Sequence, residues 1–405
     1  MENTDFTRPL AGVKVLELSQ IMAGPTCGLM LADMGATVYK IEKFPAGDDA
    51  RNYSRSGDLA LPPSFMMLNR GKRSVGVNMK NDLGRQAILR MISQVDVITE
   101  NFRAGVMDKL GLGYESLREI NPSLIYCSVS GYGPLGPLSA KGGFDLILQA
   151  FSGIISATGS EGGEPVKPAV SLADVNAGLL SVIGILAAYV RRLKTGEGAR
   201  VETSLLQASV QQLYWFAAAY FSQGINPKPS GTAHPLIAPY QIYKCREGSI
   251  AIGGANTANW LRIAAVLGHP EWLEDARFST ASMRLANRKE LEALIETALS
   301  QEAAPVWLER FDQANVPVGP VQSVGEALEH EQTKAVGMVV EADSPFNDQS
   351  MRALGLPILF NRRNHVASSA PPLVGQHSAE VLKEFGFSDL EITELCNAGA
   401  IYQAD

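Results

Sequence analysis

The sequence predicts an α/β fold with a parallel sheet and a second, smaller α+β part. The first 43 residues change from a strand pattern to a helix pattern and back, which is typical of a βαβ unit. Residues 226–235 are rich in proline and glycine and break the pattern. Strand and helix patterns return after residue 336, either as a third part or as a return to the first domain. We therefore expect domains at residues 1–225 and 226–335 and a C-terminal part at 336–405.

The N-terminal βαβ unit is the clearest of these patterns. Residues 13–18 (VKVLEL) alternate as a strand, residues 27–34 have helical spacing, and residues 37–43 (TVYKIEK) form a second strand. The topology is Rossmann-like, and Glu42 stands where an acid would bind the ribose of a dinucleotide. The turn at residues 21–26 argues against a dinucleotide because it carries one glycine and a proline, whereas the fingerprint needs three glycines.

The remaining elements follow from hydrophobic periodicity and from capping residues. In the first domain we expect strands at residues 75–79, 95–100, 124–130 and 200–204, and helices at 83–93, 101–111, 177–194 and 205–223. In the second domain we expect a hairpin at residues 240–244 and 249–253 and amphipathic helices at 287–301 and 305–314. The C-terminal part should hold short strands at residues 338–341 and 351–354 and two helices after residue 377.

Composition and charge exclude several classes of function. With 46% apolar and 19% charged residues, the 405-residue chain is globular and can bury a large core. A net charge of −7 argues against nucleic acid as a partner, because neutralising phosphates requires a surplus of Lys and Arg. The four cysteines lie far apart without a CxxC pair. We therefore expect no disulfide, no metal site and a reducing compartment.

No targeting segment is evident in the sequence. The first eight residues lack the apolar region of a secretory signal, and no mitochondrial transit peptide is evident. The most apolar run, residues 177–190, is shorter than the ~20 residues that cross a bilayer, and two arginines follow it. We expect a buried helix there, no membrane partner and a cytoplasmic protein.

Two carboxylates, Asp145 and Asp174, are the first candidates for chemistry. Each stands at the entrance of an apolar segment, and a turn rich in glycine and proline separates them. Taken alone, Asp174 would also suit the N-cap of the helix that follows it. The residues alone therefore leave a catalytic and a capping interpretation open for Asp174.

Polar residues at strand ends are the second group of candidates. Asn101 and Arg103 follow a strand directly, at the edge where open α/β sheets bind ligands. A basic cluster formed by Lys72, Arg73 and Lys80 is either a solvated turn or the rim of a phosphate site.

A set of motifs extends in order from about residue 9 to residue 400. They are LAGVKVLEL (10–18), MAGP (22–25), GATVYKIE (35–42), NRGKRS (69–74), GYG (131–133), KTGEG (194–198) and PPLVGQH (371–377). Together they resemble the family III (CaiB/BaiF) CoA-transferases, which include formyl-CoA transferase, carnitine CoA-transferase and succinyl-CoA-dependent dicarboxylate CoA-transferases. The resemblance implies acyl-CoA and a small carboxylic acid as substrates and no prosthetic group.

The resemblance also implies an architecture. Family members are homodimers of two interlaced, ring-like subunits. Each subunit has a Rossmann-like large domain built from both chain ends and a small domain between them. This would explain why strand and helix patterns return after residue 336.

The resemblance implies that Asp174, in the motif SLADVNAG (171–178), is the nucleophile. An ionised carboxylate can attack a thioester carbonyl to give a mixed anhydride, which CoA thiolate then converts to an aspartyl-CoA thioester. Asp145 replaces a glutamate of the family and is expected to have a supporting role.

The CoA contacts of the family transfer to this chain by position. Lys43 and Lys109 stand where formyl-CoA transferase has arginines, so the charge is kept and the bidentate fork is lost. The implied contacts are Met22, Ala23, Lys43, Val77, Lys80, Asn101, Phe102, Arg103, Lys109, Gly142 and Phe144.

A loop in the second domain is expected to face the acyl group. It departs from the Gly-rich loop of formyl-CoA transferase and resembles the succinyl-CoA:glutarate type. The implied residues are Gly231, Thr232, His234, Gly253 and Gly254. His234 is either a ligand of the substrate carboxylate or a polar loop residue.

Several other functions remain as alternatives. A formyl-CoA:oxalate-type or carnitine-type transferase differs only in its acids. A 2-methylacyl-CoA racemase needs a His before the Asp that matches Asp145, and Phe144 occupies that place. A non-catalytic acyl-CoA-binding protein is a further alternative. The sequence names neither the acids, nor the donors that stabilise the oxyanion, nor the pocket residues of a partner subunit.

Overall fold

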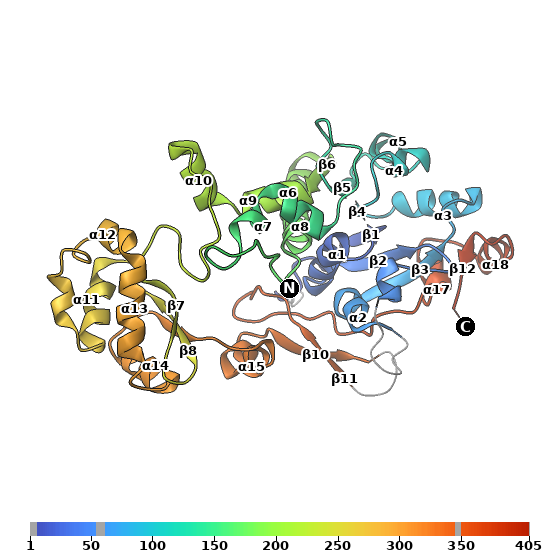
Figure 1. Cartoon of the computed structure of the whole chain (residues 1–405). Helices are drawn as coiled ribbons and strands as arrows, with labels where there is room; N and C mark the ends of the chain where they lie inside the picture. The colour runs from blue at the N-terminus through green and yellow to red at the C-terminus, as the bar shows by residue number, and fades with distance from the viewer. Residues whose placement is uncertain (1–5, 54–60, 345–349, 405) are drawn as a thin grey trace. The chain divides into compact units, whose positions relative to one another are not determined.

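The computed structural model describes residues 6–53, 61–344 and 350–404 of the chain (Figure 1). Internal contacts divide the chain into two compact units. The first unit comprises residues 1–154, 168–214 and 330–405, and the second comprises residues 155–167 and 215–329. The predicted domain borders at residues 226 and 336 lie later in the chain than these unit borders. The sequence did not indicate that residues 155–167 group with the second unit.

A seven-stranded sheet forms the centre of the first unit. Its strand order is β12-β3-β2-β1-β4-β5-β6, and every strand except β12 runs parallel to its neighbours. The order of the six parallel strands is that of a Rossmann sheet, and it reverses between β1 and β4. The predicted α/β class with a Rossmann-like topology is confirmed. The strands are β1 (Lys14–Glu17), β2 (Thr37–Glu42), β3 (Lys72–Val77), β4 (Val97–Glu100), β5 (Ile125–Ser130), β6 (Ala199–Ser204) and β12 (Ile401–Tyr402).

The alternation of apolar residues explains why β1 lies in the middle of the sheet. Leu16 and Leu18 belong to a core cluster on one face, whereas Val13 and Val15 belong to a cluster on the other. Successive side chains of a strand point to opposite faces, so a segment with apolar residues on both faces must be covered on both sides.

Helices cover both faces of the sheet in the first unit (Figure 1). The expected helix at residues 177–194 begins earlier, at Leu172, and the expected helix at 205–223 is two helices. Residues 101–105 precede a short helix instead of starting a long one. The helices of this unit before residue 214 are α1 (Ala23–Asp33), α2 (Pro63–Asn69), α3 (Asp82–Ile92), α4 (Val106–Lys109), α5 (Tyr114–Ile120), α6 (Asp145–Ser152), α8 (Leu172–Thr195) and α9 (Leu205–Gln211). Helices α7 (Ile154–Ala157) and α10 (Tyr214–Gln223) begin at the unit borders and belong, except for their first residues, to the second unit.

Helix α8 is long and apolar enough to cross a membrane by length and composition. One such helix is weak evidence for a membrane protein, and the core clusters account for the apolar residues on its inner face. It packs closely against α1 at Gly178, where a Cβ atom would lie 2.7 Å from the Ala23 carbonyl oxygen. Gly178 therefore sets how near the two helices approach at their N-terminal ends.

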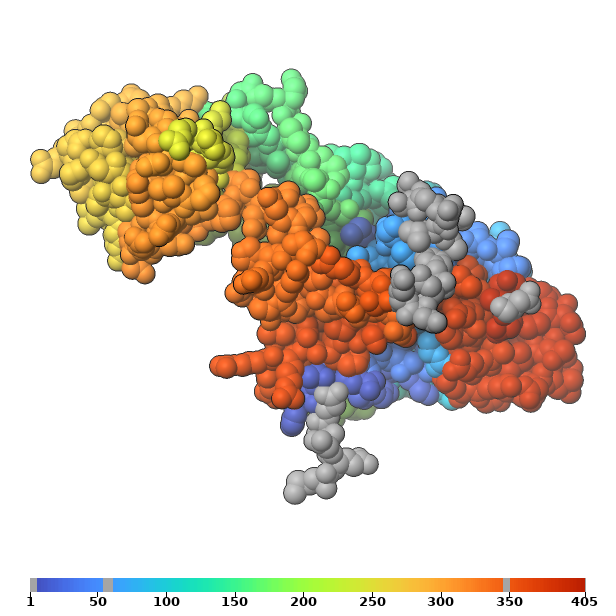
Figure 2. Space-filling model, turned by 90° about the horizontal axis from the view of Figure 1, so that it is seen from below, coloured from blue at the N-terminus to red at the C-terminus, as the bar shows by residue number. Residues whose placement is uncertain are grey.

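The C-terminal segment completes the first unit. Strand β12 pairs antiparallel with β3, and helices α17 (Ser378–Glu384) and α18 (Asp389–Asn397) add apolar side chains to the same core cluster as β1 and β3. In Figure 2 these residues, coloured red, lie against N-terminal residues coloured blue. The expected short strands are β10 (Val339–Asp343) and β11 (Ser350–Leu354), which form a separate antiparallel pair after α16 (Glu331–Ala335).

The second unit has an antiparallel sheet with its own core. The predicted hairpin is confirmed as β7 (Tyr240–Lys244) and β8 (Ser249–Gly253), and β9 (Val318–Pro320) extends it. Aromatic side chains such as Trp260, Trp307 and Phe311 fill the core beneath the sheet. The helices are α11 (Thr257–Val266), α12 (Ala281–Ala286), α13 (Arg288–Leu299), α14 (Ala304–Gln313) and α15 (Val324–Glu329).

Candidate active site

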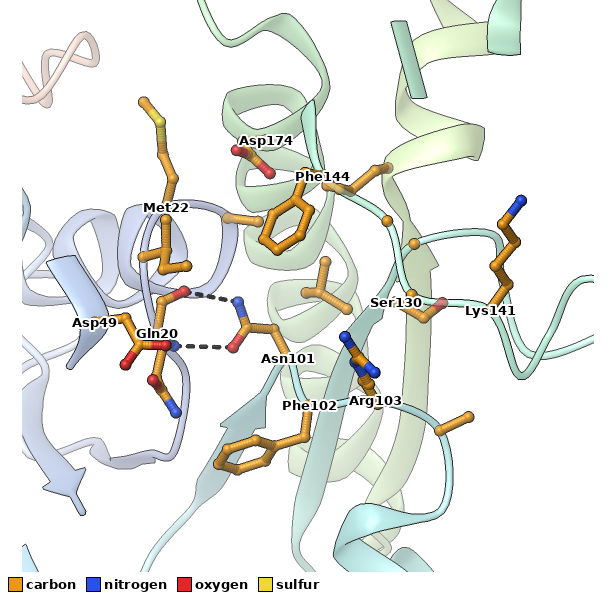
Figure 3. Close-up of a pocket in the computed structure, with 18 of the residues that line it drawn as sticks. Gln20, Met22, Asp49, Asn101, Phe102, Arg103, Ser130, Lys141, Phe144 and Asp174 are labelled. Atoms are coloured by element: carbon orange, nitrogen blue, oxygen red, sulfur yellow. Dashed lines mark hydrogen bonds between the residues drawn. The ribbon is translucent and has the colours of Figure 1, made fainter. Parts of the chain in front are cut away.

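A cavity of about 440 Å³ opens at the carboxyl ends of β1, β4 and β5, where the strand order of the sheet reverses (Figure 3). This is the place where open α/β sheets bind ligands. The N-terminal ends of α1 and α8 contribute Ala23 and Asp174 to the wall. The lining residues are Gln20, Ile21, Met22, Ala23, Asp49, Asn101, Phe102, Arg103, Ala104, Val129, Ser130, Gly131, Ser139, Lys141, Gly142, Gly143, Phe144, Asp174 and Leu205.

Asp174 lines this cavity from the first turn of α8. It is not the N-cap that its sequence context allowed, because Ser171 holds that position and makes no side-chain cap bond. Within the described part of the chain, no hydrogen bond or ion pair engages the Asp174 carboxylate. Partial burial, and then the nearby Asp145, raises the pKa of Asp174 to about 6. The carboxylate is therefore available to a ligand and still mostly ionised at neutral pH.

Asp145 is buried at the start of α6 and holds the start of α8. Its Oδ1 accepts a hydrogen bond from the backbone N–H of Ala173 at 3.0 Å, and its Oδ2 accepts one from Gln149 Nε2 at 2.6 Å. Ala173 directly precedes Asp174, so Asp145 fixes the backbone from which Asp174 projects. The two carboxylates are thus brought together as expected, but Asp145 does not line the cavity.

The raised pKa of Asp174 predicts a pH dependence. A carboxylate that attacks substrate must be ionised, so kcat/KM for acyl-CoA should fall about tenfold per pH unit below about pH 6. For a carboxyl with an unperturbed pKa, the fall in kcat/KM would begin about two pH units lower. Initial rates measured between pH 4.5 and 8, with stability checked by circular dichroism at each pH, test this. A flat profile down to pH 4.5 would contradict it.

Among the described residues, two cations reach the cavity, and only Arg103 was predicted from the sequence. Arg103 follows β4, and no side-chain hydrogen bond or ion pair engages it within the described residues (Figure 3). Lys141 comes from the glycine-rich loop before α6, with its Nζ 5.6 Å from the ring centroid of Tyr132. Both can pair with an anionic ligand. Lys141 was missed because nothing in its loop pattern distinguishes a ligand-facing lysine from a solvated one.

Asn101 lines the cavity, and its side chain also forms hydrogen bonds with the backbone of Gln20. Its Oδ1 accepts from the backbone N–H of Gln20 at 2.9 Å, and its Nδ2 donates to the Gln20 carbonyl at 2.8 Å (Figure 3). Both polar atoms of the side chain are therefore used to hold the chain after β1. Met22, Ala23, Phe102, Gly142 and Phe144, which were predicted with Asn101 to contact CoA, also line the cavity.

Four of the predicted CoA contacts do not line this cavity. Lys43 pairs with Asp49 at 2.5 Å, and Asp49 is itself a lining residue. Val77 is buried in the core and pairs with Ile401 in the sheet, so its side chain is not available to a ligand. Lys80 and Lys109 are exposed, after β3 and at the end of α4.

Of the basic cluster, only Lys72 is internal, whereas Arg73 pairs with Glu380 and Glu384 and Lys80 is exposed. The candidate ribose acid Glu42 is internal as well. Lys72 is fully buried and pairs with Glu17 at 2.9 Å, so it is neither a solvated turn residue nor part of a phosphate rim. Glu42 accepts two hydrogen bonds from Arg51, one from Ser74 and one from the backbone N–H of Asp48. These bonds occupy both of its oxygens, which leaves no free acceptor for a ribose.

The predicted substrate-loop residues belong to the second unit. His234 Nδ1 accepts from the backbone N–H of Leu236 at 3.1 Å, and burial lowers the pKa of His234. Gly231 has φ +64°, which favours glycine, and a Cβ on Gly254 would lie 2.5 Å from the Pro239 carbonyl oxygen. Thr232 Oγ1 accepts from the N–H of Ile242, and Gly253 ends β8. The acyl-facing role of this loop stays a prediction.

Among the described residues, no group of three or more His, Cys, Asp or Glu could hold a metal ion.

The model of CoA-transferase family III matches residues 10–378 of the chain. The chain belongs to this family. It is therefore a CoA-transferase, which moves CoA between an acyl-CoA and a carboxylic acid, and the predicted resemblance is confirmed.

Relatives of known activity are similar over nearly the whole length of this CoA-transferase. Human succinyl-CoA:glutarate CoA-transferase is 34% identical, over 98% of this chain and 90% of the relative. Succinyl-CoA:mesaconate CoA-transferase of Haloarcula marismortui is 35% identical, over 93% and 96%. Formyl-CoA:oxalate CoA-transferase of Shigella sonnei is 31% identical, over 98% and 100%.

Solved structures of the family share the fold. A CAIB/BAIF family protein from Brucella suis is 37% identical and superposes with a TM-score of 0.82, covering 94% of this chain and 100% of that one. The protein Rv3272 from Mycobacterium tuberculosis is 27% identical with a TM-score of 0.82, over 93% and 99%.

Proposed function

We propose that this CoA-transferase takes CoA from succinyl-CoA and gives it to a small dicarboxylic acid, with Asp174 as the nucleophile. The observation that carries the proposal is the Asp174 carboxylate on the wall of the cavity, which no side chain or backbone group of the described residues engages. A capping or structural aspartate would use its oxygens in hydrogen bonds, as Asp145 does.

The chemistry proceeds through two covalent intermediates. A carboxylate oxygen of Asp174 attacks the thioester carbonyl, and the C–S bond breaks to give a mixed anhydride and CoA thiolate. The thiolate then attacks the Asp174 carbonyl of the anhydride and releases the donor acid as its carboxylate. The acceptor carboxylate attacks the resulting aspartyl-CoA thioester, and the two steps run in reverse. No water takes part, so the thioester bond is conserved.

The cavity offers groups of the right kind for CoA. Arg103 and Lys141 supply positive charge for its phosphates, and Met22, Phe102 and Phe144 supply apolar surface for the rest of the molecule. Lys43 would first have to leave Asp49 to reach a phosphate. We assign phosphate binding to Arg103 and Lys141 ahead of Lys43.

The choice of a dicarboxylic acid as the acceptor is supported by the relatives. Relatives that share about a third of the sequence transfer CoA from succinyl-CoA to glutarate or mesaconate, according to their names. Incubation of the protein with succinyl-CoA and a panel of acids, followed by mass spectrometry of the CoA esters, tests it. We expect glutaryl-CoA or another dicarboxylyl-CoA. Transfer to carnitine alone, or to oxalate and no longer dicarboxylate, would rule out an acceptor of the glutarate or mesaconate type.

The same panel separates the rival functions. A non-catalytic acyl-CoA-binding protein would leave both substrates unchanged. A racemase would exchange deuterium at Cα of a 2-methylacyl-CoA. Phe144 argues against the racemase because the family member with that activity needs a proton-carrying His there, and a phenyl ring carries no exchangeable proton.

We further propose that the active form is the interlaced homodimer that the family resemblance implies. Supporting this, α8 has an outer face with exposed Ile183 (63%), Val190 (52%) and Leu193 (70%). Helix α6, beside α8, exposes Leu146 and Phe151 as well. Large exposed apolar surfaces of this kind mark protein interfaces.

Replacing Ile183 with lysine should weaken the dimer. A charge in the centre of an apolar interface is desolvated without a partner, so we expect the variant to elute with a smaller mass than the wild type. Size-exclusion chromatography with light scattering measures this. Leu390→Lys is the control, because Leu390 is 69% exposed on α18 and should tolerate the charge. A wild-type monomer, or an unchanged mass for Ile183→Lys, would contradict the proposal.

A further inference from the structure

Three side chains, from β2, the loop after β2 and the loop after β4, hold the turn between β1 and α1. The carbonyl of Ser19 accepts from Lys40 Nζ at 3.0 Å, and the N–H of Ile21 donates to Asp48 Oδ1 at 2.9 Å. Asn101 binds both the N–H and the carbonyl of Gln20, as described above. The backbone of three consecutive residues is therefore fixed by side chains rather than by regular secondary structure.

This turn forms part of the cavity wall, and its conformation is unfavourable. Gln20, Ile21 and Met22 all line the cavity. Ile21 has φ 69°, a left-handed conformation that a β-branched residue adopts rarely and at a cost of about 1–2 kcal/mol. Such a conformation persists only where the surroundings impose it. The hydrogen bond from Ile21 to Asp48 is one of the contacts that do so.

Asp48 is the end of a buried chain of four charges. Lys72 pairs with Glu17, Glu17 pairs with Lys40, and Lys40 pairs with Asp48, each at 2.9 Å. All four side chains have no exposed surface. Glu17 and Lys40 are register partners on neighbouring strands β1 and β2, so the sheet itself sets their separation. The two positive charges of Lys40 and Lys72 balance the two negative charges of Glu17 and Asp48.

The chain of charges reaches the start of α1 as well. Lys72 Nζ donates to the carbonyl of Pro25 at 2.9 Å, in the first turn of that helix. Buried ion pairs contribute little net stability compared with apolar residues of the same size. A structural role alone therefore gives a weak explanation for four buried charges directed at a cavity wall.

We propose that Asp48 and Lys40 are positioning residues that fix the turn at Ser19, Gln20 and Ile21, and thereby the surface on which acyl-CoA is oriented toward Asp174. The part of this inference that concerns acyl-CoA rests on the proposed function. Neither residue lines the cavity, so they act through the turn and touch no substrate. A displaced turn would misplace the thioester, and a shift of about 1 Å can lower the rate about 10²-fold.

The test compares two pairs of buried charges. Lys40→Met combined with Asp48→Asn removes one positive and one negative charge and leaves Glu17 paired with Lys72. Arg70→Met combined with Asp33→Asn is the matched control, because that ion pair at 2.6 Å is equally buried and does not line the cavity. Both changes should lower the melting temperature to a similar extent.

Two readouts distinguish positioning from general destabilisation. We expect kcat to fall about 10- to 100-fold in the first variant and less than about threefold in the control. In hydrogen exchange followed by mass spectrometry without ligand, peptides that contain residues 19–22 should exchange faster only in the first variant. Asp48→Asn alone keeps an oxygen acceptor for Ile21, so the changes in kcat and in hydrogen exchange should be smaller. This single variant replaces the double variant in the comparison if the double variant does not fold.

Unchanged exchange at residues 19–22, or an equal loss of kcat in both double variants, would overturn the positioning role. The exchange measurement needs no substrate. If the wild-type protein transfers no CoA with any donor, the proposed function fails, while the exchange comparison still decides whether Asp48 and Lys40 hold the turn.

Discussion

Asp174→Ala should lower kcat/KM for CoA transfer by at least about 10³-fold. The change removes the oxygen that forms the anhydride, and no second carboxylate within the described part of the cavity is placed to replace it. Asp49 is the other lining carboxylate, and Lys43 pairs with it. Binding of CoA itself should weaken little, because the lining cations remain. Steady-state kinetics with succinyl-CoA and the best acceptor, together with calorimetric titration of CoA, measure both effects.

A loss of folding would give the same kinetic result, so stability must be measured too. The raised pKa of Asp174 means that the folded state favours the protonated carboxyl, so this group lowers stability as the pH rises from 3.8 to about 6, and the loss is nearly complete at pH 7. Asp174→Asn should therefore melt no lower than the wild type at pH 7 while being inactive. Asp82→Ala is the control, since Asp82 is an exposed first-turn aspartate of α3 and should retain full activity. Normal turnover of Asp174→Ala with every acid tested would refute the nucleophile assignment.

Asp145→Ala should have the second largest effect, a fall in kcat of about 10²-fold. The variant leaves the N–H of Ala173 without its charged acceptor, so the first turn of α8 can shift and carry Asp174 with it. Stability should also fall, because the site is buried. Rapid-quench measurement of the first turnover, beside thermal melting, separates the chemical step from destabilisation.

Asp145→Asn separates the hydrogen bond from the charge. Its side-chain oxygen can still accept from Ala173, so kcat should fall less than in Asp145→Ala. Without the neighbouring anion the pKa of Asp174 should drop, and the acid limb of the rate profile should move to lower pH. Asp49→Asn should leave the position of that limb unchanged. If both Asp145 variants behave alike and the limb stays at about pH 6, Asp145 neither positions nor polarises Asp174.

Local patterns predicted most of the fold. The N-terminal βαβ unit, the hairpin of β7 and β8, and helices α13 and α14 were expected because hydrophobic periodicity and turn residues define them within short stretches. Helix α8 was predicted to begin at Ala177 rather than Leu172, because the Asp and Asn of its first turns break the apolar run that marked the helix. The pairing of β12 with β3 joins distant parts of the chain, which no local pattern reveals.

The cavity was predicted only in part, because some of its supporting contacts join residues that are distant in the sequence. Asp174, Arg103 and Phe144 were named by matching motifs, and the fold brings them to one cavity. Lys40 and Lys72 look like surface residues in the sequence, because lysine is rarely buried without a partner. Their partner Glu17 lies on another strand, so only the register of the sheet reveals the pairing.

Trapping the covalent intermediate with hydroxylamine tests whether Asp174 is the nucleophile. The protein is incubated with succinyl-CoA and hydroxylamine, digested, and analysed by mass spectrometry. An aspartyl-CoA thioester or anhydride at Asp174 would be converted to a hydroxamate, so the account predicts a modified peptide at Asp174 that requires succinyl-CoA and is absent in Asp174→Asn. A hydroxamate at another carboxylate, or turnover with no modified peptide at all, would contradict it.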